Sequence, residues 1–206
     1  MATVPNVYII ETLHPEDEGM GRMEGAFLSH VLRLYGRSPE YSYVRTASGF
    51  KDAIKQFRAS KCRYLHISAH GSKKGIVTTN RDRVSYVRLA TLLDGVPSNT
   101  RLFMSSCEVV HDLSAEVLVG NEGVLSLLGP RNKILMTDAA AIWASFYHLA
   151  FKEMDAKEDN GGRPTMSNTH MKSCLKSIMK LFDGDFSFYT RGSNGELIDH
   201  LHDIGN

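Results

Sequence analysis

The sequence predicts one α/β domain over residues 1–206, with a doubly wound, mostly parallel six-stranded sheet and helices on both faces. Short apolar runs bounded by turn or polar residues alternate with segments whose apolar residues recur at helical spacing. Two of these runs, one over 63–68 and one beginning at Arg101, lead into His70-Gly71 and Cys107-Glu108. If both are parallel strands of one sheet, His70 and Cys107 emerge at the same edge, where open α/β sheets place their sites.

The expected strands are short, apolar and bounded by polar or turn residues. In chain order they cover 7–11, 41–45, 63–68, the run from Arg101, 133–137 and 186–190. A small hairpin over 75–84, with Asn80 to Asp82 at its turn, is expected after His70-Gly71. The strand over 133–137 would end at Asp138.

The expected helices follow from apolar residues three or four positions apart. The first apolar face consists of Met23, Phe27, Val31 and Leu34, and Gly36 occupies the place of a carboxyl-terminal cap. Further helices are expected after the N-caps Ser48 and Ser85, over 114–119, over 139–154 and over about 170–182. The segment 155–163, which contains Asn160-Gly-Gly, is expected to be a mobile surface loop.

The composition argues against several classes of protein. The chain has 42% hydrophobic and 23% charged residues and a formal net charge of +1, so no global field favours nucleic acid or a membrane surface. The three cysteines, Cys62, Cys107 and Cys174, are odd in number and far apart, which is typical of a reducing compartment. No signal peptide is evident, and no apolar run reaches the roughly 18 residues that span a bilayer. We therefore expect a cytoplasmic protein that contacts neither nucleic acid nor membrane directly.

Cys107 and His70 are the candidate catalytic residues. Cysteine is nucleophilic as its thiolate, so it needs a neighbouring base, and histidine is the side chain that titrates near neutrality. Gly71 lets the backbone approach a reacting carbonyl, and its N–H with that of Cys107 could form an oxyanion hole. Either residue alone is more often an inert buried thiol or a structural histidine. Their matching positions after two apolar runs weaken that interpretation.

Two motifs carry a resemblance to a known family. The blocks Leu65–Gly71 and Leu102–Glu108 resemble the catalytic motifs of the caspase-like (clan CD) cysteine peptidases, and the Cys107-Glu108 step with the segment Ile142–Leu149 looks most like the CHAT branch. The resemblance implies a caspase-like fold, a Cys–His dyad of Cys107 and His70, and cleavage of a protein substrate after a chosen P1 residue. It also implies a bacterial defence protease acting on a gasdermin-like or other partner. Because tetratricopeptide repeats are absent, a separate regulatory or sensor protein is expected.

Two interpretations of the P1 pocket remain open. Asp138 resembles the acidic residue with which separases bind a P1 arginine, whereas Arg22 loosely resembles the arginine with which caspases bind a P1 aspartate. Asp138 could instead be the N-cap of the helix expected at 139. The loop acids Glu16, Asp17 and Glu18 leave the first strand on the catalytic side, which weakly favours a basic P1 residue.

Two other classes of function are compatible with the pattern. One is a catalytically inactive binding or scaffold module with a caspase-like fold. The other is a flavodoxin-like binder of a small ligand, which would need no Cys–His pair. Neither Cys62 nor Cys174 has a partner at zinc-ligand spacing, and no phosphate-binding glycine loop is present, so no metal and no cofactor are expected.

Overall fold

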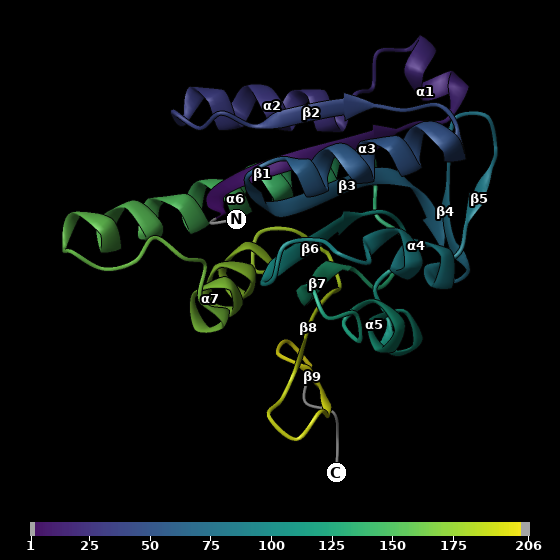
Figure 1. Cartoon of the computed structure of the whole chain (residues 1–206). Coiled ribbons are helices and arrows are strands. Elements are labelled where there is room, and N and C mark those ends of the chain that lie inside the picture. Colours follow the sequence, from purple (N-terminus) through teal and green to yellow (C-terminus); the bar gives the residue numbers. More distant parts are fainter. Residues whose placement is uncertain (1–2, 203–206) are drawn as a thin grey trace.

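A computed structural model describes residues 3–202, which fold around one mixed sheet (Figure 1). The strands along the sheet follow the order β2-β1-β3-β6-β7-β8-β9, and β4 pairs with the end of β3 and with β5. Their bounds are β1 Val4–Thr12, β2 Glu40–Tyr43, β3 Cys62–Ser72, β4 Gly75–Val77, β5 Arg83–Val84, β6 Thr100–Ser105, β7 Val124–Pro130, β8 Phe186–Arg191 and β9 Leu197–Asp199. The strands β2, β1, β3, β6 and β7 run parallel, and β8 and β9 are antiparallel to their neighbours.

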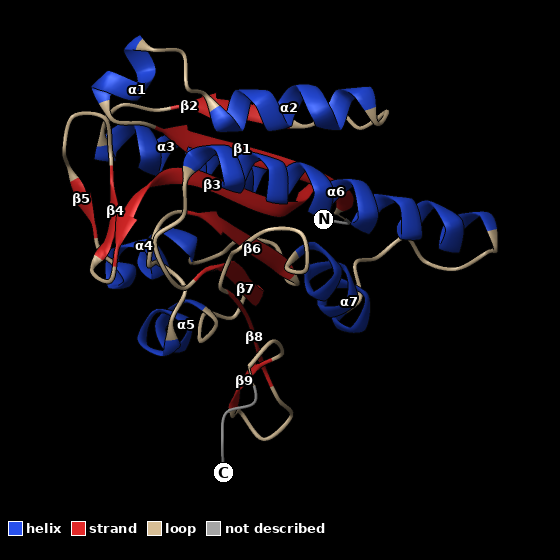
Figure 2. Cartoon of the chain, turned by 180° about the vertical axis from the view of Figure 1, so that it is seen from behind, coloured by secondary structure: helices blue, strands red, loops and turns tan. Residues whose placement is uncertain are grey.

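Helices cover both faces of the sheet. Their bounds are α1 Pro15–Gly19, α2 Glu24–Leu34, α3 Ala47–Ala59, α4 Tyr86–Leu93, α5 Asp112–Leu118, α6 Met136–Asp159 and α7 Asn168–Ile178. One hydrophobic core joins the sheet to α3, α4 and α5, and a second joins it to α2, α6 and α7, which Figure 2 shows on the near side. This arrangement confirms the α/β class with a mostly parallel sheet.

The second core is largely aromatic. Phe103 of β6 contacts Trp143, Phe146 and Tyr147 of α6, with ring centroids between 5.5 and 5.8 Å apart. These residues are fully buried, and each aromatic side chain removes a large apolar area from water. The contacts fix α6 across the sheet, so its first turn lies beside the carboxyl edge of β6 (Figure 2).

The expected strand over 133–137 is wrong. The strand beside β6 is β7, and α6 begins at Met136. A short apolar run does not by itself distinguish a strand from a helix start, and Leu135, the N-cap of α6, is exposed. The run from Val124 is longer, and six of its seven residues are buried. The helix expected over 139–154 is present and is longer at both ends.

Three other boundaries differ from expectation. Asp155–Asp159 belongs to α6, so at most residues 160–163 of the expected loop are a connection. The N-cap of α3 is Thr46, whose side chain accepts a hydrogen bond from the N–H of Gly49, and not Ser48. The segment after β1 contains the short helix α1.

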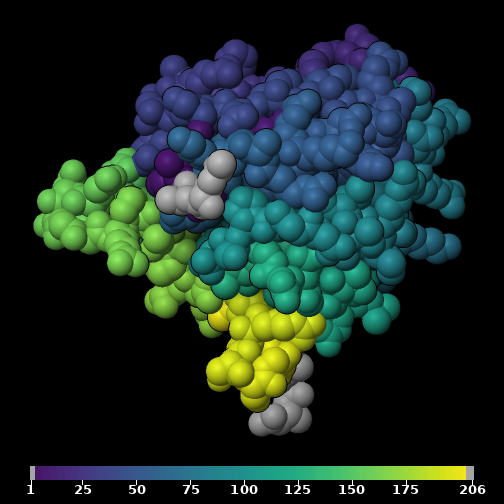
Figure 3. Space-filling view, viewed as in Figure 1, coloured from purple at the N-terminus to yellow at the C-terminus, as the bar shows by residue number. Residues whose placement is uncertain are grey.

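Figure 3 shows the green end of α6 and the yellow β8–β9 segment projecting from the body of the molecule.

The apolar face expected for α2 is also wrong. The helix buries Glu24, Gly25, Leu28, Ser29 and Leu32, whereas Phe27 and Leu34 are exposed. Because Glu24, Leu28 and Leu32 recur at intervals of four, they share one face of the helix. The buried face therefore begins with a carboxylate, which the count of apolar residues could not indicate.

Candidate active site

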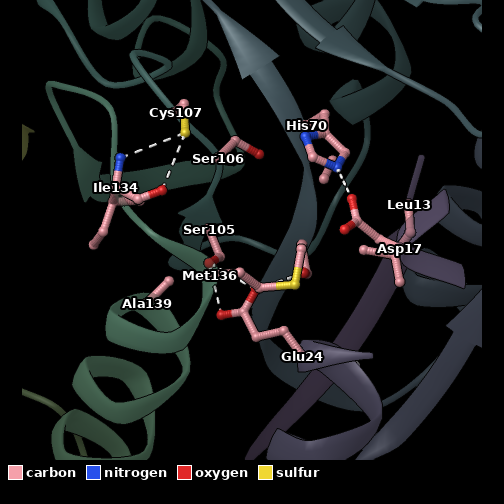
Figure 4. A pocket seen from close by; sticks show the side chains of 12 residues that line it. Leu13, Asp17, Glu24, His70, Ser105, Ser106, Cys107, Ile134, Met136 and Ala139 are labelled. Atoms are coloured by element: carbon pink, nitrogen blue, oxygen red, sulfur yellow. Dashed lines mark hydrogen bonds and ion pairs between the residues drawn. The ribbon is translucent and has the colours of Figure 1, made fainter. Parts of the chain in front are cut away.

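The register of two parallel strands brings His70 and Cys107 to one edge. Ser68 of β3 pairs with Ser105 of β6, and His70 and Cys107 each follow two residues after that pair. Both side chains line one cavity of about 180 Å³ at the carboxyl edge of the sheet (Figure 4). The juxtaposition expected from the sequence is therefore present.

A tight turn presents Cys107. Glu108 has φ 57°, a left-handed conformation that is uncommon and costs roughly 1–2 kcal/mol for a residue with a Cβ. Gly71 packs against this turn, because a Cβ there would lie 2.9 Å from Cβ of Ser106 and 3.1 Å from the carbonyl oxygen of Cys107. The His-Gly strand end and the cysteine turn can approach this closely only when residue 71 is glycine.

His70 is oriented by Asp17, which the sequence analysis placed on the catalytic side only as one of the acids that favour a basic P1 residue. Nε2 of His70 lies 2.7 Å from Oδ2 of Asp17, whose side chain is 14% exposed. Asp17 belongs to α1 and also accepts from Nη1 of Arg22 at 3.2 Å. Figure 4 shows the second ring nitrogen of His70 on the side that faces Ser106 and Cys107. The carboxylate therefore fixes the ring and leaves Nδ1 available to the cavity.

The sulfur of Cys107 lies against the backbone before α6. Its Sγ is 3.5 Å from both the nitrogen and the carbonyl oxygen of Ile134. Cys107 is partly exposed, and within residues 3–202 no hydrogen bond joins it to His70 (Figure 4). In uncomplexed active sites the catalytic hydrogen bonds are often long and tighten when substrate binds, so the separation is compatible with a dyad.

Glu24 contributes a buried carboxylate to the cavity, and sequence reasoning missed it. Its carboxylate accepts from Oγ of Ser68 at 2.6 Å and from Oγ of Ser105 at 2.7 Å. Burial raises the pKa of Glu24 to about 7; the two serine hydrogen bonds oppose this rise, and the charge of Glu11 adds to it. Among residues 3–202 no cation pairs with this carboxylate, which contacts both of the strands that lead to the candidate dyad.

Glu11 explains why Glu24 is placed there. The carboxylate of Glu11, at the end of β1, accepts from the N–H groups of Gly25 and Ala26 at 2.7 and 3.2 Å and from Oη of Tyr41 at 2.7 Å. The helix α2 has no side-chain cap of its own, so Glu11 satisfies its first N–H groups from a neighbouring strand. Burial raises the pKa of Glu11 as well. The sequence feature that could have indicated this cap is Glu11 itself, a glutamate near the end of an apolar strand.

Neither of the two residues expected for the P1 pocket lines this cavity. Asp138 is the third residue of α6 and is not its N-cap, which is Leu135 and has no side-chain cap hydrogen bond. The residues that line the cavity include Met136 and Ala139 of this helix, and they do not include Asp138. Arg22 is exposed and pairs with Asp17. The acidic side chains within the cavity are Asp17 and Glu24.

A second cysteine–histidine pair is closer than the first. Sγ of Cys174 lies 3.2 Å from Nε2 of His170 in α7, and His170 forms an ion pair with Glu153 of α6. Burial raises the pKa of the Cys174 thiol to about 11, and the charge of Glu153 acts in the same direction. A buried neutral thiol is a poor nucleophile, so this pair serves as a natural control for the first.

Other candidates have structural roles. His111 caps α5 by accepting from the N–H of Ser114, and burial lowers its pKa. Over the described range, residues 3–202, no three His, Cys, Asp or Glu side chains gather as a metal site. None of the helices in this range combines the length and apolar character needed to cross a membrane.

The fold is similar to those of known cysteine proteases at low sequence identity. The complex of the pro- and mature domains of RgpB from Porphyromonas gingivalis matches with TM-score 0.52 and 12% identity, over 84% of this chain and 42% of that chain. Two structures of a secreted C11 cysteine protease from Bacteroides thetaiotaomicron, the first of them named iotapain, match with TM-scores of 0.56 and 0.58 and identities of 9% and 7%. The second of them holds an irreversible peptide inhibitor.

The matches cover only part of each of the other chains. The chain spans less than half of the RgpB chain and about two thirds of the C11 protease chains, of which it covers 67% and 66%. No protein-family model and no curated protein matches the sequence. The likeness establishes a shared fold, which confirms the caspase-like α/β class that the sequence predicts.

Proposed function

We propose that this chain is a cysteine endopeptidase in which Cys107 and His70 form the catalytic dyad. The observation that carries the proposal is the equal offset of the two residues from the Ser68–Ser105 pair, which sets both in one cavity. Asp17 would position the imidazole. The shared fold with cysteine proteases supports the same assignment.

The reaction would proceed through an acyl-enzyme. The Cys107 thiolate attacks the scissile carbonyl carbon, an S–C bond forms, and the carbonyl electron pair moves to oxygen. The backbone N–H groups of Gly71 and Cys107 donate to that oxygen. His70 protonates the leaving nitrogen as the C–N bond breaks, and it then takes a proton from the water that attacks the thioester. Loss of the thiolate from the second tetrahedral intermediate releases the acid and restores the enzyme.

Glu24 favours a basic P1 residue. A side chain that enters the cavity between His70 and Cys107 meets a buried carboxylate, and a cation there would recover part of the desolvation cost of the charge. Removal of one partner of such a pair costs about 2–5 kcal/mol. The preference for a basic P1 residue that the sequence analysis expected is thus kept. Glu24 replaces Asp138 as the carboxylate that binds the P1 side chain, and a variant of Asp138 tests the alternative.

The specificity test uses a ratio of rates. The kcat/KM for a peptide with P1 Arg is divided by that for the same peptide with P1 Gln, so that titration of the catalytic groups cancels. The ratio should exceed ten in the wild type and rise with pH through about 7, where free Glu24 ionises. Glu24→Gln should abolish the preference and its pH dependence, while Asp138→Asn should preserve both. The opposite pattern would assign the pocket to Asp138.

The activity test uses the second cysteine–histidine pair as its control. Cys107→Ala and His70→Ala should each abolish cleavage of a P1-varied peptide library, and the double variant should lose no more, because the pair acts as a unit. Cys174→Ala and His170→Ala should retain cleavage. Persistence of cleavage in purified Cys107→Ala, or a wild type that cleaves nothing, contradicts the proposal; the second result favours a catalytically inactive binding module.

A cellular role follows from the resemblance of the sequence to a family branch. The resemblance of the Cys107-Glu108 block to the CHAT branch supports a cytoplasmic defence protease with a separate sensor protein and a gasdermin-like or other protein substrate. The cysteines Cys62, Cys107 and Cys174 are free, which agrees with a reducing compartment. Cleavage of a co-expressed candidate substrate by the wild type, and not by Cys107→Ala, is the corresponding test.

A further inference from the structure

A second cavity lies at the opposite edge of the sheet from the candidate active site. It has a volume of about 510 Å³, and its lining includes Arg63, Arg101 and Arg163 but no acidic residue. Arg63 and Arg101 are the second residues of β3 and β6, the strands whose far ends carry His70 and Cys107. Figure 3 shows the green surface of the α6–α7 segment adjoining the teal surface around β6 on this side.

Arg101 is a buried cation for which residues 3–202 supply no anionic partner. The residue is 6% exposed, and its guanidinium donates to Oγ of Ser126 at 2.9 Å, to the carbonyl oxygen of Met166 at 2.7 Å and to Oδ1 of Asn168 at 2.9 Å. All three acceptors are neutral. Burial lowers the pKa of Arg101 to about 10; Tyr64 opposes this shift, and the nearby charge of Arg63 adds to it. Buried charges in proteins are normally paired, so this one is available to an anion.

The other two arginines extend the positive field towards solvent. Arg63 is half-buried and held in place by Thr3, to whose side-chain and carbonyl oxygens it donates at 3.1 and 2.9 Å. Arg163 is exposed at the cavity's rim. In the part of the chain that the structure describes, none of the three arginines has a carboxylate within ion-pair distance.

The amino terminus of α7 adds backbone donors. Ser167, the N-cap of this eleven-residue helix, lines the cavity, and the first turn contains no acidic residue. A helix amino terminus carries a partial positive charge and favours phosphate groups. Thr165 and Ser167, which also line the cavity, each carry a hydroxyl group. Guanidinium groups, hydroxyls and a helix amino terminus together form a donor set suited to a phosphate.

We propose that this cavity binds a small phosphorylated molecule carrying at least two negative charges. Its volume falls within the range of roughly 300–1,000 Å³ that is common for small-molecule sites. A cavity of this volume, lined in part by a buried arginine, suits a compact ligand better than a strand of nucleic acid or a protein surface. The proposal concerns binding and is independent of the proposed peptidase activity.

The test measures binding to the full chain by calorimetry, with inorganic phosphate, pyrophosphate and tripolyphosphate as probes at constant ionic strength. One saturable site is expected, with affinity rising from phosphate to pyrophosphate. Arg63→Gln and Arg163→Gln should each weaken pyrophosphate binding about tenfold or more, because each removes a charge-assisted hydrogen bond. Arg88→Gln, an exposed arginine on α4, is the matched control and should bind as the wild type does.

Arg101→Gln removes the buried cation and should abolish binding if the variant folds; the Arg63 and Arg163 variants decide the question if it does not. The absence of saturable binding of any probe would overturn the proposal, as would binding that Arg63→Gln and Arg163→Gln leave unchanged. A phosphopeptide or a short oligonucleotide that binds more tightly than tripolyphosphate through the same arginines would overturn the assignment to a small molecule. Binding can be measured with Cys107→Ala, so the result does not depend on catalysis.

Discussion

Replacing Glu24 by Gln should remove a pH-dependent loss of stability that the buried carboxylate imposes on the wild type. Burial raises the pKa of Glu24 from its ordinary value of 4.5 to about 7, so the native state binds this proton more tightly than the unfolded chain does. The stabilisation is fully present below pH 4.5 and is lost as the pH rises through about 7. The difference corresponds to about 3 kcal/mol at 1.36 kcal/mol per pH unit.

Gln reproduces the neutral form and can still bond to Ser68 and Ser105. The unfolding free energy of Glu24→Gln minus that of the wild type should therefore increase by about 2–3 kcal/mol between pH 5 and pH 8.5. For a chain of this size that corresponds to about 4–12 °C in Tm. Groups that titrate in both proteins cancel in the difference.

Urea unfolding of the two proteins at several pH values measures this difference directly. Glu122→Gln, an exposed glutamate, is the matched control, and its difference from the wild type should stay constant across the range. A constant difference for Glu24→Gln as well would show that the carboxylate is solvated and ionised like an ordinary one. A P1 cation would then have no desolvation cost of Glu24 to offset, and Glu24 would not favour a basic P1 residue.

Two further predictions concern the candidate active site, and a third concerns the connection after α6. Asp17→Asn should lower kcat about tenfold or more with little change in KM, because the hydrogen bond to His70 at 2.7 Å orients the catalytic ring; a change in KM alone would refute this. Gly71→Ala should destabilise the protein by about 1–3 kcal/mol in urea unfolding, because its Cβ would lie 2.9 Å from Cβ of Ser106, and an unchanged midpoint would refute the packing. Limited proteolysis, including self-cleavage, should cut at 160–163, after the end of α6, and cutting within 155–159 would contradict the helix there.

The strand ends could be predicted because their signal is local. His70-Gly71 and Cys107-Glu108 follow apolar runs, and parallel strands of one sheet share a carboxyl edge, so the pairing needed no knowledge of distant contacts. The capping hydroxyl of Ser85 was predicted for the same reason.

The carboxylates could not be placed from the sequence because their roles depend on long-range contacts. Asp17 reaches His70 across 53 positions, and Glu24 reaches Ser68 and Ser105 across 44 and 81. Glu11 caps a helix that begins 13 residues later in the chain, and no local pattern marks a cap supplied by another element. Apolar periodicity also assigned the wrong face of α2, because it gives no weight to a buried carboxylate.

Long-range contacts also decide whether residues 124–130 or residues 133–137 form the strand beside β6. Both runs are apolar, and the first one fills the position beside β6, where Leu127 and Leu128 pair with Leu102 and Phe103. Because β7 occupies the position beside β6, the segment after it is not needed as a strand, and the long helix α6, which carries the aromatic core, begins at Met136.

The central claim is that Cys107 is the nucleophile and that His70 activates it. The most direct measurement is the mass of each cysteine-containing peptide after the protein reacts with a peptidyl chloromethyl ketone that bears arginine at P1. A single adduct on Cys107 is expected in the wild type, its formation should slow at least a hundredfold in His70→Ala, and Cys62 and Cys174 should stay unmodified. An adduct on Cys174, or labelling of Cys107 at an equal rate without His70, would contradict the account.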